Sequence, residues 1–203
     1  MPSIQNELVE ELRAKNASVR DIAYAAANIP IEFWNITRND IEVTSKNKPI
    51  FSYVTEYVDS LHNMISDGKG LTMLGSPKSG KTLFGCAILK SAAINPKSMR
   101  RDYHVIRVNY DTIIEDFEHL KREQDSYMEL RNNLTRANIL FIDSLSFTIP
   151  PGVLLSIART RRDFKKSTIL ATSIELAKLQ SSRIQEIIDV FRDVNKVYSV
   201  DRH

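Results

Sequence analysis

Cysteine is almost absent from this 203-residue sequence, and long apolar runs are missing altogether. Cys86 is the single cysteine, so no disulfide can form within the chain, and a reducing cytoplasm is the expected location. No uninterrupted apolar run approaches the roughly 20 residues that a membrane-spanning helix needs. The polar, acidic N-terminus is also unlike a secretion signal. The sequence therefore predicts a cytoplasmic protein that does not enter a membrane.

A strong excess of one charge is also lacking. The chain has 28 basic and 25 acidic residues, for a formal net charge of +3. Any contact with nucleic acid would therefore come from local basic patches. Hydrophobic residues make up 42% and charged residues 26%, which is typical of a soluble globular protein with a sizeable core. No internal repeat or low-complexity segment interrupts this pattern.

Strand and helix patterns alternate along most of the chain. Strands are expected at residues 71–75, 102–110, 137–143, 167–173 and 196–200. Helices are expected between them, at residues 50–66, 81–93, 111–123, 153–164 and 181–191. The central strands are apolar throughout, which is typical of a parallel sheet buried on both faces. We therefore predict a three-layer α/β domain from about residue 50 to the end.

The N-terminal 28 residues form two predicted helices, with Ser18 as the cap of the second. We interpret residues 1–28 as a helical extension, 29–49 as a connector and 50–203 as the main domain. The break between the helices has some likeness to a helix-turn-helix, but an amphipathic pair is the simpler interpretation. Its apolar residues are suited either to docking in a partner's groove or to packing on the chain's own domain: Leu8, Leu12, Ile22 and Tyr24.

Residues 75–82 read GSPKSGKT and match the phosphate-binding pattern G-x-x-x-x-G-K-[ST], between an apolar strand and a helix. Backbone N–H groups and the helix N-terminus supply the donors that a polyphosphate needs, and the glycines allow close approach. Lys81 is expected to reach the β- and γ-phosphates, and the Thr82 hydroxyl to bind Mg²⁺. The predicted ATP-binding residues are Gly75, Ser76, Pro77, Lys78, Ser79, Gly80, Lys81 and Thr82.

A P-loop also needs an acidic residue at the end of a neighbouring buried strand, close to the metal. Asp143 follows the apolar residues of NILFID and is the predicted second Mg²⁺ ligand beside Thr82. Many ATPases of this type place a second carboxylate immediately afterwards, but this chain has Ser144. A hydroxyl is not a general base at neutral pH. We therefore expect an ATPase that either hydrolyses slowly or borrows a carboxylate from elsewhere.

The strand STILATS ends in Thr172 and Ser173. In a parallel sheet this end would emerge beside Asp143 and the phosphates, because ligand crevices gather at the carboxyl ends of strands. A hydroxyl there can sense the γ-phosphate, although an ordinary polar strand end fits the same residues. Cys86, on the helix after the P-loop, is expected in the core. The histidines have no metal-ligand spacing.

The order of these motifs resembles the AAA+ ATPases of the bacterial helicase-loader group, the DnaC and DnaI type with their phage counterparts, and the related IstB-type ATPases. The resemblance covers about residues 28–195 and includes SGKT, NILFIDS, TILATS and SSRIQEII. It implies a parallel-sheet AAA+ P-loop fold with ATP and Mg²⁺. It also implies that Lys81, Asp143, Thr172, Ser173 and Arg183 are the catalytic residues. Arg183 would be the finger that enters a neighbouring subunit's site; a surface salt bridge explains it equally well.

The resemblance implies a phage or mobile-element helicase loader that binds the replicative DNA helicase and places it on single-stranded DNA during replication. ATP would act as an assembly switch for a ring or spiral of subunits. Three alternatives stay open: an IstB or TnsC kind of transposition ATPase that polymerises on DNA, a small-molecule kinase, and a nucleotide-binding scaffold without hydrolysis. Two basic clusters are candidates for contact with the DNA backbone: Arg159, Arg161, Arg162, Lys165 and Lys166, and Lys97, Arg100 and Arg101.

Overall fold

The computed structural model describes residues 2–94, 103–146, 152–174 and 184–200. At its centre lies a parallel sheet of five strands in the order β2-β3-β4-β1-β5. The strands are β1 (Gly70–Leu74), β2 (Val105–Asn109), β3 (Ile139–Leu145), β4 (Ser167–Thr172) and β5 (Asn195–Ser199). Both β1 and β4 are buried along their whole length, as their continuous apolar sequences predict.

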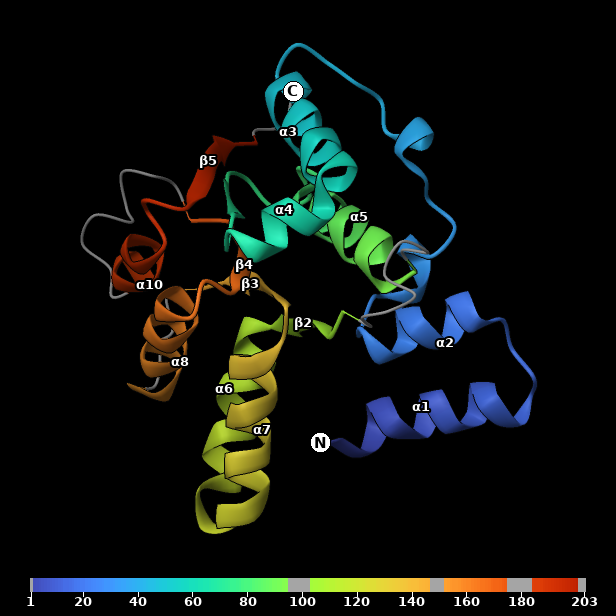
Figure 1. The fold of residues 1–203 in the computed structure, drawn as a ribbon, viewed down its shortest axis with the longest axis vertical. Coiled ribbons are helices and arrows are strands. Elements are labelled where there is room, and N and C mark those ends of the chain that lie inside the picture. The colour runs from blue at the N-terminus through green and yellow to red at the C-terminus, as the bar shows by residue number, and fades with distance from the viewer. Residues whose placement is uncertain (1, 95–102, 147–151, 175–183, 201–203) are drawn as a thin grey trace.

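Helices cover both faces of the sheet and complete the predicted three-layer α/β fold (Figure 1). One face carries α3 (Lys48–Asp59), α4 (Leu61–Ser66) and α5 (Lys81–Ala93). The other carries α6 (Tyr110–His119), α7 (Gln124–Arg136), α8 (Gly152–Asp163) and α10 (Ile184–Val190). Each face has its own hydrophobic core. The fold class predicted from the sequence is therefore confirmed.

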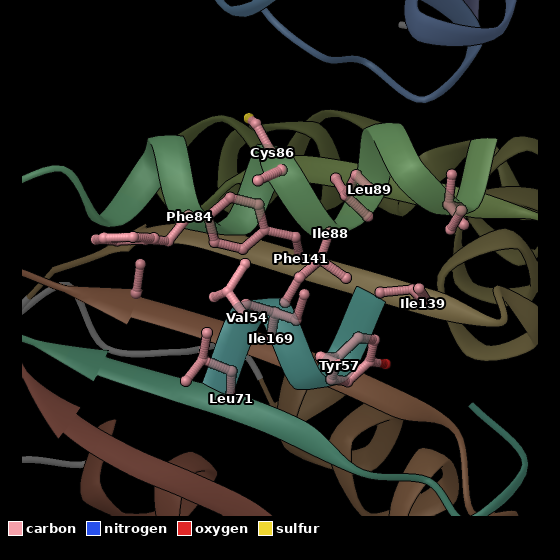
Figure 2. Close-up of a cluster of buried hydrophobic side chains, with 14 of the residues drawn as sticks. Val54, Tyr57, Leu71, Phe84, Cys86, Ile88, Leu89, Ile139, Phe141 and Ile169 are labelled. Atoms are coloured by element: carbon pink, nitrogen blue, oxygen red, sulfur yellow. The ribbon is translucent and has the colours of Figure 1, made fainter. Parts of the chain in front are cut away.

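The core on the α5 face is built around the aromatic ring of Phe141 on β3 (Figure 2). A Cβ atom added at Gly85 would lie 2.3 Å from this ring, so α5 can pack this closely only because residue 85 is glycine. Cys86 is fully buried in the same cluster, which confirms its predicted place in the core. Burial raises the pKa of the Cys86 thiol to about 12, so the group stays protonated at neutral pH.

Several local predictions are confirmed and others need correction. Ser18 caps α2 (Val19–Ala26), because its hydroxyl accepts a hydrogen bond from the Asp21 N–H at 3.1 Å. The Asn109 side chain caps α6, because its Oδ1 accepts hydrogen bonds from the Asp111 and Thr112 N–H groups. The single helix predicted at 50–66 is two helices, α3 and α4. The helix α7 was not predicted at all, because its exposed surface is strongly polar.

The N-terminal helices α1 (Pro2–Ala14) and α2 lie beside the β2 edge of the sheet (Figure 1). Tyr24 is only 4% exposed and packs edge-on against Trp34, with ring centroids 6.1 Å apart. Tyr24 therefore packs in the chain's own core, which is one of the two alternatives that the sequence left open for it. Leu8 is 42% exposed and remains accessible. Among the described residues, no helix combines the length and apolar character that a membrane span requires.

Candidate nucleotide-binding site

The segment between β1 and α5 is a tight loop at the carboxyl end of the sheet. Gly75 has φ 135° and Gly80 has φ 93°, both in the region that favours glycine. A Cβ atom on Gly75 would lie 2.1 Å from the carbonyl oxygen of Val200, so the loop also touches the main chain that follows β5. Gly80 forms the N-cap of α5. The geometry is that of a loop whose N–H groups can gather around an anion.

The Lys81 ammonium lies inside this loop. Its Nζ donates to the carbonyl oxygens of Gly75 at 2.9 Å and Ser76 at 2.7 Å, and to the Ser79 hydroxyl at 3.1 Å. The side chain is buried, so its charge is held where solvent screens it poorly. A cation fixed at the centre of a loop and next to a helix N-terminus attracts phosphate groups.

Thr82 and Asp143 are brought together from positions 61 residues apart. The Thr82 hydroxyl donates to Asp143 Oδ1 at 3.2 Å, and Asp143 is only 2% exposed. A hydroxyl and a carboxylate are oxygen ligands of the kind that Mg²⁺ prefers, so these residues fit the ion. One expectation was wrong: β3 is not the strand next to β1, because β4 lies between them.

The structure adds Arg107, which sequence reasoning missed. From β2, its Nε and Nη2 atoms donate to Asp143 Oδ2 at 3.1 and 2.7 Å. The Arg107 side chain is 15% exposed, so this ion pair is largely buried. A signal was available in the sequence, because an arginine interrupts the apolar strand VIRVN. Its partner could not be deduced without the register, which pairs Arg107 with Phe141 and Asn109 with Asp143.

Ser144 lies at an irregularity of β3, where the register with β4 shifts between Ile142 and Leu145. It is exposed and has φ 63°, an unusual conformation for serine. A second carboxylate stands near this strand end: Asp111, whose Oδ1 accepts a hydrogen bond from the Ser146 hydroxyl at 2.7 Å. Asp111 is therefore a candidate for the carboxylate that another element would have to supply in place of one at position 144.

Thr172 and Ser173 differ sharply in their surroundings. The Thr172 hydroxyl is buried, donates to the Leu145 carbonyl at 2.8 Å and accepts from the Ile174 N–H at 3.1 Å. These bonds join the ends of β3 and β4. Ser173 is exposed. The role of γ-phosphate sensor stays a prediction for both residues, and the geometry favours Ser173 because the Thr172 hydroxyl already serves the main chain.

Arg161 does not belong to a DNA-binding surface, which corrects one member of the predicted basic cluster. The side chain is fully buried. Burial lowers the pKa of Arg161 to about 9, which leaves the guanidinium charged at neutral pH. Its three nitrogen atoms donate to the carbonyls of Leu134, Thr135, Ala137 and Ser167 and to the Thr168 hydroxyl.

The other residues of the two predicted basic clusters are partly within and partly outside the described residues. Arg159 and Lys165 are exposed, Lys166 is partly exposed, and Arg162 lies 3.6 Å from Asp193. Phe164, within this cluster, is also well exposed. The predicted arginine finger and the second basic cluster lie outside the described residues: Arg183, Lys97, Arg100 and Arg101.

Neither a protein-family model nor a curated protein matches the sequence. Solved structures do match the fold. The DnaC helicase loader has 22% identity and a TM-score of 0.69, over 84% of this chain and 99% of that one. This chain therefore shares its fold with the DnaC helicase loader. DnaI matches at 16% identity and a TM-score of 0.66, over 84% of this chain and 94% of DnaI.

The replication initiator DnaA, in a structure bound to AMPPCP and single-stranded DNA, has the same fold at 18% identity and a TM-score of 0.66. That match covers 86% of this chain and 51% of the DnaA chain. Identities this low establish a shared fold, and activity has to be argued from the residues of the site. The α/β fold with a parallel central sheet, expected from the sequence, is thus found in proteins with which this chain shares about one residue in five.

Proposed function

We propose that this chain is an ATP-binding helicase loader, which binds the replicative DNA helicase and promotes its loading onto single-stranded DNA. The observation that carries the proposal is the Thr82–Asp143 contact of 3.2 Å beside the buried Lys81. This arrangement provides phosphate donors, a fixed cation and a pair of metal ligands at one edge of the sheet. The match to nearly the whole DnaC chain supports a loader over the other uses of a P-loop.

Each part of the site has a role in holding ATP. The loop's N–H groups and Lys81 bind the β- and γ-phosphates, and Thr82 and Asp143 hold Mg²⁺. The ion offsets phosphate charge when it is bound. Ser173 senses the γ-phosphate from the end of β4, and Arg183 of a neighbouring subunit completes the site. ATP then ties subunits into a ring or spiral and acts as an assembly switch.

Hydrolysis is slow in this proposal, because Ser144 cannot accept a proton from the attacking water. Asp111 is close enough to β3 to bond Ser146 and could supply a weaker substitute. Slow turnover suits a switch that has to persist until loading is finished. The ATP-bound state is then the working state, and hydrolysis ends it.

The N-terminal extension is the proposed helicase-docking element, with residue 28 as its boundary. Val19 is 84% exposed and Leu8 is 42% exposed, so apolar side chains remain accessible after Tyr24 is buried. A cavity of about 370 Å³ lies beside α1 and α2, and it is also lined by β2, α6 and α7. Apolar helix faces next to a groove suit the docking of a partner helix.

The test is complex formation with the replicative helicase of the organism that encodes this chain. Size-exclusion chromatography with ATP or ADP should give a complex that forms preferentially with ATP. Lys81→Ala should abolish both nucleotide binding and ATP-dependent assembly. Lys121→Ala, which removes an exposed lysine paired with Glu118, is the matched control and should behave like wild type.

Unchanged nucleotide affinity in Lys81→Ala would contradict the proposed site. ATP-dependent filaments on duplex DNA without a helicase complex would favour the transposition ATPase. Phosphoryl transfer to a metabolite would favour the kinase. Each of these outcomes would overturn the loader proposal.

A further inference from the structure

The Asp143 carboxylate has two partners of different kinds. Its Oδ1 accepts from the neutral Thr82 hydroxyl, and its Oδ2 accepts two hydrogen bonds from the Arg107 guanidinium. Charge-assisted bonds of this type are about twice as strong as neutral ones. The proposed metal-holding carboxylate is therefore already neutralised by a built-in cation.

The main chain of Arg107 is held by the N-terminal extension. Its N–H donates to the Ala27 carbonyl at 2.9 Å, and its carbonyl accepts from the Asn28 side chain at 2.9 Å. These bonds extend the free edge of β2 and join segments about 80 residues apart. Asn28 has φ 55°, so the turn that brings its amide to β2 uses a left-handed conformation.

We infer that Arg107 is a positioning residue that limits the affinity of the Asp143 site for Mg²⁺ and links that site to the N-terminal extension. This inference rests on the proposed ATP-binding function. A guanidinium bonded to one carboxylate oxygen repels a divalent cation approaching the other, and the low exposure of the pair strengthens this repulsion. Mg²⁺ binding therefore has to weaken or share the Arg107–Asp143 contact.

The link to the extension follows from the bonds of the β2 edge. A shift of Ala27 and Asn28 moves the Arg107 main chain, because two hydrogen bonds of 2.9 Å hold these segments together. Movement of Arg107 changes how firmly it holds Asp143. A partner that docks on α1 and α2 can thus alter Mg²⁺ use without contacting the nucleotide.

The first experiment measures the Mg²⁺ concentration that gives half-maximal enhancement of fluorescent ATP-analogue binding, with EDTA as the baseline. Arg107→Gln should lower this concentration by about three- to tenfold, because an amide keeps a donor but removes the charge. Arg107→Lys keeps the charge and should stay close to wild type. An unchanged or raised value in Arg107→Gln would overturn the inference.

A measurement on the wild-type protein guards against a variant that fails to fold. Nitrogen-15 NMR of the Arg107 Nε–H should show faster exchange with solvent when Mg²⁺ and the ATP analogue are added, since the bond to Asp143 Oδ2 is weakened. Equal exchange with and without Mg²⁺ would count against the inference. If wild type does not bind the analogue at all, the proposed function fails instead, so the two failures are distinguishable.

The second experiment tests the link to the extension with Asn28→Gly, which keeps the left-handed turn but removes the amide that bonds Arg107. The half-maximal Mg²⁺ concentration should change by about twofold, in the same direction as in Arg107→Gln. Asn16→Gly is the matched control, because Asn16 also has a positive φ, of 52°, but lies at the end of α1. Identical values in the two variants would overturn the link.

Discussion

Two arginines, Arg107 largely buried and Arg161 fully buried, lie at opposite ends of the sheet and have different kinds of partner. Arg107 reaches the carboxyl end of β3 and bonds the carboxylate of Asp143. Arg161 lies at the amino ends of β3 and β4, and its partners among the described residues are main-chain carbonyls and the Thr168 hydroxyl. An arginine such as Arg161, whose donors bond main-chain carbonyls, keeps the same partners and stabilises the fold. A cation paired with a carboxylate that is proposed to bind a metal ion can be displaced, so it can tune a site.

The largest effect on stability is expected at the amino ends of the strands, where Arg161 lies. Arg161→Met should reduce the free energy of unfolding by about 3–5 kcal/mol, because several buried acceptors lose their donors at once. Urea unfolding measures this change. Arg162→Met, which removes a partly exposed arginine 3.6 Å from Asp193, is the control and should cost less than about 1 kcal/mol. Equal losses would erase the proposed difference between the ends.

The second-largest effect is expected at the carboxyl ends of the strands, and it should appear in Mg²⁺-dependent ATP binding rather than in stability. Thr82→Val preserves side-chain shape but removes the hydroxyl that bonds Asp143. The enhancement of ATP affinity by Mg²⁺ should fall roughly tenfold or more, while unfolding free energy should change by about 1 kcal/mol at most. Calorimetric titration with and without Mg²⁺ measures the first quantity. A large loss of stability with normal Mg²⁺ dependence would show that this end is structural too.

A smaller effect on stability is expected from Tyr57, whose hydroxyl lies at the amino ends of β1 and β4. Its buried hydroxyl lies 2.6 Å from the Ser167 hydroxyl and donates to the Lys69 carbonyl at 3.3 Å. Tyr57→Phe should lower the unfolding free energy by about 1 kcal/mol and leave nucleotide affinity unchanged. Thermal unfolding combined with an ATP titration tests both parts. Weakened ATP binding would contradict the separation of the two ends.

The smallest effect is expected from Ser144→Glu, which places a second carboxylate directly after Asp143. Steady-state ATP turnover should rise severalfold, on the order of 1 kcal/mol in activation free energy. Ser144→Gly is the matched control: it relieves the φ of 63° and should add up to about 1 kcal/mol of stability without changing turnover. No gain from the glutamate would show that the missing carboxylate is not what limits hydrolysis.

Much of the fold could be predicted because its signals are local. The strands β1, β3 and β4 are nearly continuous apolar runs, and the P-loop pattern requires a strand before it and a helix after it. The helix α7 escaped prediction because its sequence is mostly polar and only Leu134 is buried. We expected β3 to lie next to β1, but β4 lies between them. Strand order depends on crossovers that the local sequence does not specify.

Part of the candidate site could also be predicted, because its signals are local as well. Lys81, Thr82 and Asp143 belong to short motifs whose chemistry is readable along the chain. Charge alone could not separate Arg161 from its exposed neighbours, because one turn of α8 places it inward while Arg159 faces solvent. The sequence likewise left both docking and core packing open for Tyr24, and its contact with Trp34 shows that it packs in the core.

The sequence by itself determined that a glycine-containing loop with the phosphate-binding pattern joins a buried strand to a helix, because glycine backbone freedom and residue spacing are local properties. Only the tertiary structure decided which charges meet. Strand order and register place Arg107 on Asp143 and leave Arg161 among carbonyls. The physical reason is that electrostatic partnership depends on distance and burial, and both are set by how distant segments pack together.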